Sequence, residues 1–131
     1  MLYAILCYND ENVTGSWSKE EDDACMVRLE AVQSDLTTQG RLGPVARLLP
    51  PTAATTVRKG RGEPLVIDGP FDETKEQLLG FYVLDCVSLD AALDAARDLA
   101  KANPGTGAYE IRPLQIFHRG LALPGMGRPA L

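Results

Sequence analysis

The chain has 131 residues, 45% of them hydrophobic, which is enough for one domain with its own core and no disulfide staples. Its formal net charge is -5 and its basic residues are scattered, so neither nucleic acid nor an anionic membrane surface is an expected partner. No apolar run approaches the roughly 20 residues that cross a bilayer. Since the N-terminus also lacks the basic region and cleavage site of a signal peptide, we expect a cytoplasmic protein.

The cysteines and the histidine exclude the common metal sites. Cys7, Cys25 and Cys86 are odd in number and far apart in sequence, so neither a disulfide framework nor a thiolate zinc cluster is predicted. Each lies in an apolar pattern, and we interpret all three as small buried hydrophobic residues. His118 is the single histidine, which excludes a multi-histidine metal site. We expect no metal and no cofactor.

The N-terminal third predicts a strand, a loop and a helix. Residues 2–8 are apolar on both alternating faces, as in a strand covered on both sides. A polar loop is expected at residues 9–17. Ser18 and Glu21 have the spacing of a capping box, so a helix is predicted from there to about Gln39, with an acidic first turn that matches the helix dipole. Its buried stripe is expected to be Cys25, Leu29, Val32 and Leu36.

The middle of the chain predicts an edge strand and a hairpin. Residues 42–49 have β character, but Gly43-Pro44 makes that strand irregular or places it at a sheet edge. Short β-type runs at 53–59 and 64–67 flank the turn Gly60-Arg61-Gly62. Two β runs joined by a glycine-rich turn predict a β-hairpin.

The C-terminal half predicts a strand, a helix and a last strand. Residues 78–86 are apolar on both faces, and Ser88 then caps a helix that Asn103-Pro104-Gly105 ends. The last strand is expected at 108–117. The apolar stripe of the second helix is expected to be Leu89, Leu93, Ala96 and Ala100.

The order β-α-β, hairpin, β-α-β predicts an α+β fold: a ferredoxin-like βαββαβ sheet with two helices on one face and an inserted β-hairpin. A single domain is expected over residues 1–118, followed by a C-terminal tail, 119–131, that is loose or covers a neighbour. Both faces of the strands are apolar, but the two helices cover only one face of the sheet. We therefore predict a homodimer that packs sheet against sheet; the alternative is a face covered by the hairpin and tail.

Several short motifs together indicate a family. They are Asp68-Gly69-Pro70-Phe71, then Glu73-Thr74-Lys75-Glu76 and Gly80-Phe81-Tyr82, supported by the strand Tyr3–Tyr8, Gly40 before Leu42, Leu49-Pro50-Pro51, Thr56-Val57-Arg58 and Tyr109-Glu110-Ile111-Arg112-Pro113. On these residues the chain resembles the YCII-related family, in its DGPF-domain branch.

The resemblance implies a dimeric α+β barrel within a group that includes enzymes acting on small ring compounds. It also implies a cleft with a His/Asp pair, the histidine lying near the first helix. This chain departs from that pattern, because residues 18–40 contain no histidine. Asp68 is left as a carboxylate without an imidazole partner.

Asp68 and Glu76 are the candidate catalytic residues, and Glu73 and Lys75 between them are candidate ligand-binding residues. Asp68 either forms an Asp-Gly-Pro turn or acts as a general base at the mouth of a pocket. Glu73, Lys75 and Glu76 precede a buried strand. They either surround a ligand, where a sheltered carboxylate pair would serve acid and base roles, or form ion pairs with Arg58 or Arg112.

Two arginines and two tyrosines complete the predicted ligand site. Arg112 and Arg58 are candidate clamps for an anion, because a guanidinium matches a carboxylate. Arg112 stands among apolar neighbours, so we expect it to have an internal acidic partner or an acidic ligand. Tyr3 and Tyr82 are placed either in the same cleft or in the core.

Three functions remain open from the sequence. The first is a small enzyme that moves a proton on a small organic acid or ring compound, with Asp68 or Glu76 as base and Arg112 as anchor. The second is a non-catalytic small-ligand sensor or accessory protein that uses the same pocket, which the missing histidine favours. The third is a structural dimerisation module.

Overall fold

The structure, a computed structural model, describes residues 1–121. A short 3-10 turn at Pro51–Ala53 precedes the hairpin. In chain order the other elements are β1 (Leu2–Asp10), α1 (Glu11–Gly15), α2 (Lys19–Thr38), β2 (Leu42–Arg47), β3 (Thr55–Arg58), β4 (Leu65–Asp68), β5 (Glu76–Asp85), α3 (Leu89–Ala102) and β6 (Ala108–Pro113).

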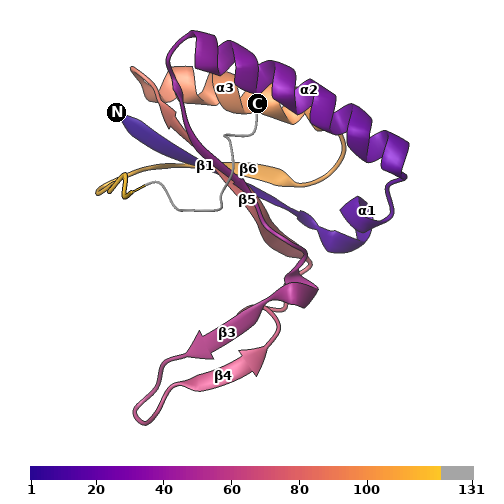
Figure 1. Ribbon diagram of the computed structural model, residues 1–131, viewed down its shortest axis with the longest axis vertical. Coiled ribbons are helices and arrows are strands. Elements are labelled where there is room, and N and C mark those ends of the chain that lie inside the picture. The colour runs from indigo at the N-terminus through magenta and orange to yellow at the C-terminus, as the bar shows by residue number, and fades with distance from the viewer. Residues whose placement is uncertain (122–131) are drawn as a thin grey trace.

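The main sheet is antiparallel and has the order β2-β5-β1-β6, so β1 and β5 are central and β2 and β6 are its edges. The two long helices, α2 and α3, lie side by side over one face of this sheet (Figure 1). This arrangement confirms the predicted α+β class and is consistent with a ferredoxin-like fold. The predicted hairpin is present as a separate two-stranded sheet of β3 and β4.

The core lies between the sheet and the two helices. Tyr3 and Ile5 of β1 meet Tyr82 and Leu84 of β5 on the face that the helices cover. From the helices the core takes Cys25, Leu29 and Leu36 of α2, and Ala92, Ala95, Ala96, Leu99 and Ala102 of α3. The four alanines keep α3 close to the sheet, and Leu99 fills the space beneath it with no exposed surface.

Both helix starts are capped as predicted. The Ser18 hydroxyl accepts the amide of Glu21 at 3.1 Å, and the Glu21 carboxylate in turn accepts the amide of Ser18. The Ser88 hydroxyl accepts the amide of Ala91 at 3.2 Å. Such caps satisfy amides that have no partner inside the helix, and each is worth about 1 kcal/mol.

Three predicted boundaries were wrong. Residues 9–17 are not one loop, because β1 continues to Asp10 and α1 follows at once. The Asp10 carboxylate accepts the amide of Asn12 at 2.8 Å and so starts that turn. β2 ends at Arg47 rather than residue 49. β6 ends at Pro113 rather than Phe117, since the amide of Leu114 makes the final bond to β1.

The predicted stripe of α3 is confirmed at Ala96 but is otherwise displaced around the helix. Leu89 is exposed and Ala100 is largely so, while the buried positions are Ala92, Ala95, Ala96, Leu99 and Ala102. A helix rich in alanine offers several nearly equivalent apolar faces, so spacing alone does not select one. The predicted stripe of α2 is confirmed at Cys25, Leu29 and Leu36.

The β3–β4 hairpin, called here the arm (residues 55–68), leaves the end of the β2–β5 pair and projects away from the two helices (Figure 1). Gly69 follows it with a φ of 105°, a conformation that glycine adopts easily, and its amide bonds to the carbonyl of Ala54. Most of the predicted tail, 119–131, lies outside the described residues. Within residues 1–121, no helix has the length and apolarity that a membrane span requires.

Candidate functional site

The predicted catalytic residues, Asp68 and Glu76, and the predicted ligand-binding residues Glu73 and Lys75 lie on or beside the arm and face solvent. Asp68 ends β4, Glu73 and Lys75 follow in the connecting segment, and Glu76 begins β5; all four are exposed. The side-chain amide of Gln77 holds this segment by donating to the carbonyl of Thr74 at 2.9 Å. In the described part of the chain, none of these charges forms an ion pair.

The predicted arginine clamps also lie apart from one another. Arg58 of β3 stacks over Phe71, with 5.3 Å between its guanidinium carbon and the ring centre. Arg112 is exposed on the edge strand β6, and the internal ion pair expected for it is absent among residues 1–121. The expectation that the Arg112 charge is buried was wrong, because β6 is an edge strand of the sheet and Arg112 points away from the helices.

The two predicted tyrosines are core residues. Tyr3 is 5% exposed and Tyr82 is 8% exposed, both beneath α2 and α3. Glu76 pairs with Asp10 and Arg112 pairs with Ala4, so about 20 Å separates their positions along β1 at ~3.3 Å per residue. Within one chain the structure therefore does not bring the predicted site residues together.

A cleft lies elsewhere, between α3 and the edge strand β6. Its volume is about 300 Å³, at the lower end of the range for small-molecule sites. Its apolar wall is built by Leu93, Ala96 and Ala100 of α3 together with Ile111 of β6. Three of the four residues in the predicted α3 stripe thus line this cleft.

The polar end of the cleft is a cluster of neutral groups, Cys7, Cys25, Asn103 and Tyr109, called here the polar cluster. The side-chain amide of Asn103 donates to the Tyr109 hydroxyl at 3.3 Å, and its oxygen accepts from the Cys25 thiol at 3.4 Å. Tyr109 lies beside Cys7, because the two residues pair across β6 and β1. Cys7, Asn103 and Tyr109 line the cleft, and Cys25 stands behind them.

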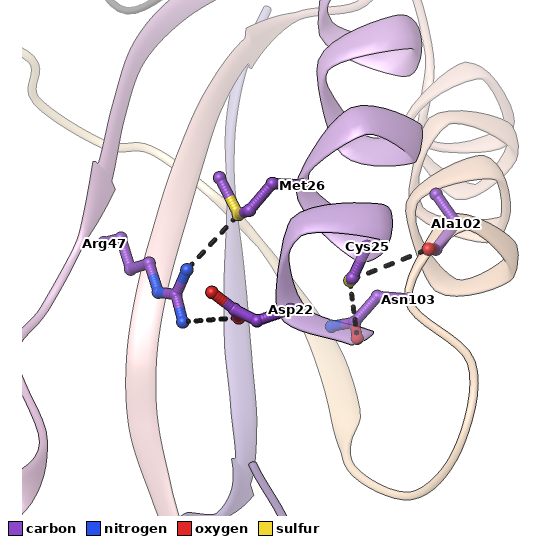
Figure 2. Close-up of polar contacts among 6 residues, drawn as sticks. All are labelled: Asp22, Cys25, Met26, Arg47, Ala102 and Asn103. Carbon is purple, nitrogen blue, oxygen red and sulfur yellow. Dashed lines mark hydrogen bonds and ion pairs between the residues drawn. The ribbon is translucent and has the colours of Figure 1, made fainter. Parts of the chain in front are cut away.

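Figure 2 shows how α2 contributes to this region. Cys25 points from the first half of α2 toward the C-terminal end of α3, where its thiol meets the carbonyl of Ala102 as well as Asn103. On the other side of the helix, Arg47 of β2 reaches Asp22 at 3.2 Å and the sulfur of Met26 (Figure 2). These contacts tie the start of α2 to both the sheet and the end of α3.

The loop between α3 and β6 is fixed against β1. Asn9, 5% exposed, donates through its side-chain amide to the carbonyl of Thr106 at 3.1 Å and accepts from the Thr106 hydroxyl at 3.1 Å. Gly107 has a φ of 104°, and a Cβ there would lie 2.5 Å from the carbonyl oxygen of Tyr8. Only a glycine lets the loop approach β1 so closely, and this approach shapes the rim of the cleft.

Burial keeps the ionisable groups of the cleft protonated. It raises the pKa of the Cys7 thiol, a rise that the neighbouring Tyr109 hydroxyl partly offsets. Burial also raises the pKa of Cys25 and of Tyr109, against the smaller opposing effects of Arg28 and Asn103, respectively. Because all three shifts are upward from basic values, these groups act as neutral hydrogen-bonding groups at pH 7.

Arg97 is the one charged residue, among residues 1–121, that lines the cleft. Arg97 stands at its rim and pairs with Asp94 at 3.1 Å, with their side chains 66% and 75% exposed. Such a surface pair contributes about 0–1 kcal/mol, so Arg97 is free to bind an anion. Among residues 1–121, no Asp or Glu lines the cleft and no three His, Cys, Asp or Glu side chains form a potential metal site.

The sequence analysis did not single out these residues as a site. Cys25 and Cys86 are buried as predicted, but Cys7 is half-buried and reaches the cleft. Asn103 was identified only as a helix end. One feature of the sequence could have indicated the cleft: two polar residues, Asn103 and Tyr109, flank a glycine-rich turn that follows an alanine-rich helix.

Comparison with known proteins gives a family. Residues 1–117 match the YCII-related domain family. A protein of Rhizobium meliloti (strain 1021), itself named as uncharacterized, is 64% identical over 120 residues, which cover 92% of this chain and 97% of that protein. The match spans both long helices, the whole sheet and the arm.

Proposed function

This chain belongs to the YCII-related family, and we propose that it is a small-ligand-binding protein whose α3–β6 cleft takes a small organic acid with an apolar body. The observation that carries this proposal is the composition of the cleft. It combines an apolar wall, a set of neutral hydrogen-bonding groups and one cation, Arg97. Such a combination fits a ring or short chain that bears a carboxylate.

Each part of such a ligand has a counterpart in the cleft. The apolar body would lie against Leu93, Ala96 and Ala100, where burial is favourable by about 25 cal/mol per Å². The carboxylate would meet Arg97, whose guanidinium has five N–H donors and spends one in its contact with Asp94.

Proton-transfer catalysis has less support than binding. A general base must be deprotonated at working pH and within hydrogen-bond reach of the ligand. Cys7 and Tyr109 are the ionisable groups at the polar end of the cleft, and burial raises the pKa of both. Asp68 and Glu76, the bases predicted from the sequence, are exposed on the arm and at its junction with β5.

Thermal unfolding with benzoate as probe tests the proposal, with methyl benzoate as the uncharged analogue. Benzoate at ten times its Kd stabilises the protein by about 1.4 kcal/mol, and Arg97→Gln removes most of that gain. The matched control, Arg61→Gln on the arm, leaves it unchanged. Benzoate recovered intact after incubation supports binding over catalysis. The proposal fails if benzoate, salicylate and phenylacetate all leave the unfolding temperature unchanged, or if Arg97→Gln retains the full gain.

We further propose that the chain acts as a homodimer through the sheet face opposite the helices, in the manner of a dimeric α+β barrel. Leu6 and Phe81 pair across β1 and β5 on that face, with Ala46 of β2 opposite Phe81, and all three are partly exposed. A second sheet would cover them. Sedimentation equilibrium gives the oligomeric state, and a monomer at 100 μM (about 1.4 mg/mL, from the 14.2 kDa chain mass) contradicts this arrangement.

A further inference from the structure

The arm carries apolar surface that its own chain does not bury. Five exposed large hydrophobic side chains lie on the arm or just after it: Val57, Leu65, Val66, Ile67 and Phe71. Scattered exposed hydrophobic residues are normal, but a set this dense on one projecting element marks an interaction surface. The arm is also the part of the chain that stands farthest from the two helices (Figure 1).

The two faces of the arm differ. On one face Arg58 stacks over Phe71, and the Thr56 hydroxyl donates to the carbonyl of Gly69 at 2.8 Å, so the chain partly covers this side. On the other face Val57 lies directly opposite Val66, and these side chains are 61% and 70% exposed. The Val57–Val66 face therefore has no cover within residues 1–121.

A two-stranded hairpin is at best marginally stable in water when it stands alone. Both of its strands also have a free edge, which invites pairing with another chain. The arm has four residues in each strand and its interstrand pairs include Val57–Val66 and Thr56–Ile67. Its order therefore depends on something packed against it.

The charge of the arm fits a second copy of this chain. Residues 55–68 carry three basic side chains, Arg58, Lys59 and Arg61, and two acidic ones, Glu63 and Asp68, for a net charge of +1, whereas the whole chain has a net charge of -5. The first turn of α2 has two exposed carboxylates, Glu20 and Glu21, which give any second copy an acidic surface. Opposite potentials of this kind favour association and set its orientation.

We propose that the arm is a dimerisation element that packs its Val57–Val66 face against a second copy of this chain, with its basic turn toward acidic surface of that copy. The inference rests on the homodimer proposed above and adds a second contact to it, outside the sheet. It is independent of the ligand in the α3–β6 cleft. In the dimer the Val57–Val66 face of the arm is buried, whereas in the single chain it is exposed.

Sedimentation equilibrium of the full chain tests this with paired variants. Val57→Asp with Val66→Asp introduces two charges into the proposed contact, and the dimer Kd rises by about 100-fold or more. The matched control is Val27→Asp with Val87→Asp, two valines that are 66% and 95% exposed on the body; its dimer Kd stays within about threefold of the original.

Hydrogen exchange of the unaltered protein gives a readout that needs no variant. Amides of residues 55–68 exchange more slowly as the protein concentration rises through the dimer Kd, while amides of α3 do not change. Arg61→Glu at the turn weakens the dimer and reduces its dependence on salt.

The outcomes separate the two proposals. A dimer whose Kd is the same with the arm variants and the control overturns the arm contact and leaves the homodimer standing. A monomer at 100 μM overturns both. Arm amides that are protected equally at all concentrations show that the chain covers its own arm, and this too overturns the inference.

Discussion

Removing one hydroxyl, in Tyr109→Phe, tests whether the polar cluster is built as described. The Tyr109 hydroxyl accepts from the side-chain amide of Asn103 at 3.3 Å in partly buried surroundings. A neutral hydrogen bond contributes about 0.5–1.5 kcal/mol, and leaving a buried donor unpaired costs about 1–3 kcal/mol. With this bond lost and Asn103 left with an unpaired donor, the free energy of unfolding falls by about 1–3 kcal/mol, which chemical denaturation measures.

The same substitution changes the chemistry of Cys7. The neighbouring Tyr109 hydroxyl lowers the pKa of this thiol, so its removal raises that pKa further and leaves less thiolate at pH 8. Alkylation of Cys7 by iodoacetamide, followed by mass spectrometry of each cysteine peptide, becomes slower. Tyr8→Phe is the matched control, since it removes a phenol that bonds Glu110 at the surface. Equal stability and an equal Cys7 alkylation rate in Tyr109→Phe and Tyr8→Phe would refute the cluster.

Three other predictions concern stability. Gly107→Ala, at a φ of 104° and with its Cβ 2.5 Å from a carbonyl oxygen of β1, lowers the free energy of unfolding by about 2 kcal/mol or more, whereas Gly62→Ala, in open space, changes it by under about 1 kcal/mol. Leu99→Ala removes a fully buried side chain and costs about 2–5 kcal/mol in the same denaturation assay. The thiols of Cys7 and Cys25 have higher pKa values in the folded protein than in the unfolded chain. Their contribution to the free energy of unfolding is therefore complete below the unfolded pKa and is lost as the pH rises above it. The free energy of unfolding therefore falls between pH 8 and 10, and it falls less steeply in the double variant Cys7→Ala with Cys25→Ala. An equal pH dependence in the two proteins contradicts this.

Local sequence signals predicted the fold well because they are set by short-range physics. The capping box of α2, the Ser88 cap of α3, the glycine-rich hairpin turn and the alternating strands each depend on neighbouring residues, and all are present. The stripe of α3 was misplaced because a run of alanines has no strongly preferred face. The extent of β6 was overestimated because apolar character continues past Pro113, where the chain leaves the sheet.

The site was harder to predict because it depends on long-range pairing. Cys7, Cys25 and Tyr109 are far apart in sequence and meet because β1 pairs with β6 and α2 packs against α3. The charged motif around Asp68 was conspicuous in sequence, yet it lies on the arm and faces solvent. The charged residues that stand out in the sequence belong to the arm and its connection to β5. The polar end of the cleft is instead lined by neutral polar residues that the sequence does not single out.

The most direct test of ligand binding in the α3–β6 cleft is a titration of the protein with benzoate, followed by two-dimensional amide NMR. The account predicts saturable shifts concentrated at Thr106 to Tyr109 and along the cleft side of α3, and their loss in Arg97→Gln. No saturable shift, or shifts confined to residues 68–76 at the base of the arm, would contradict it.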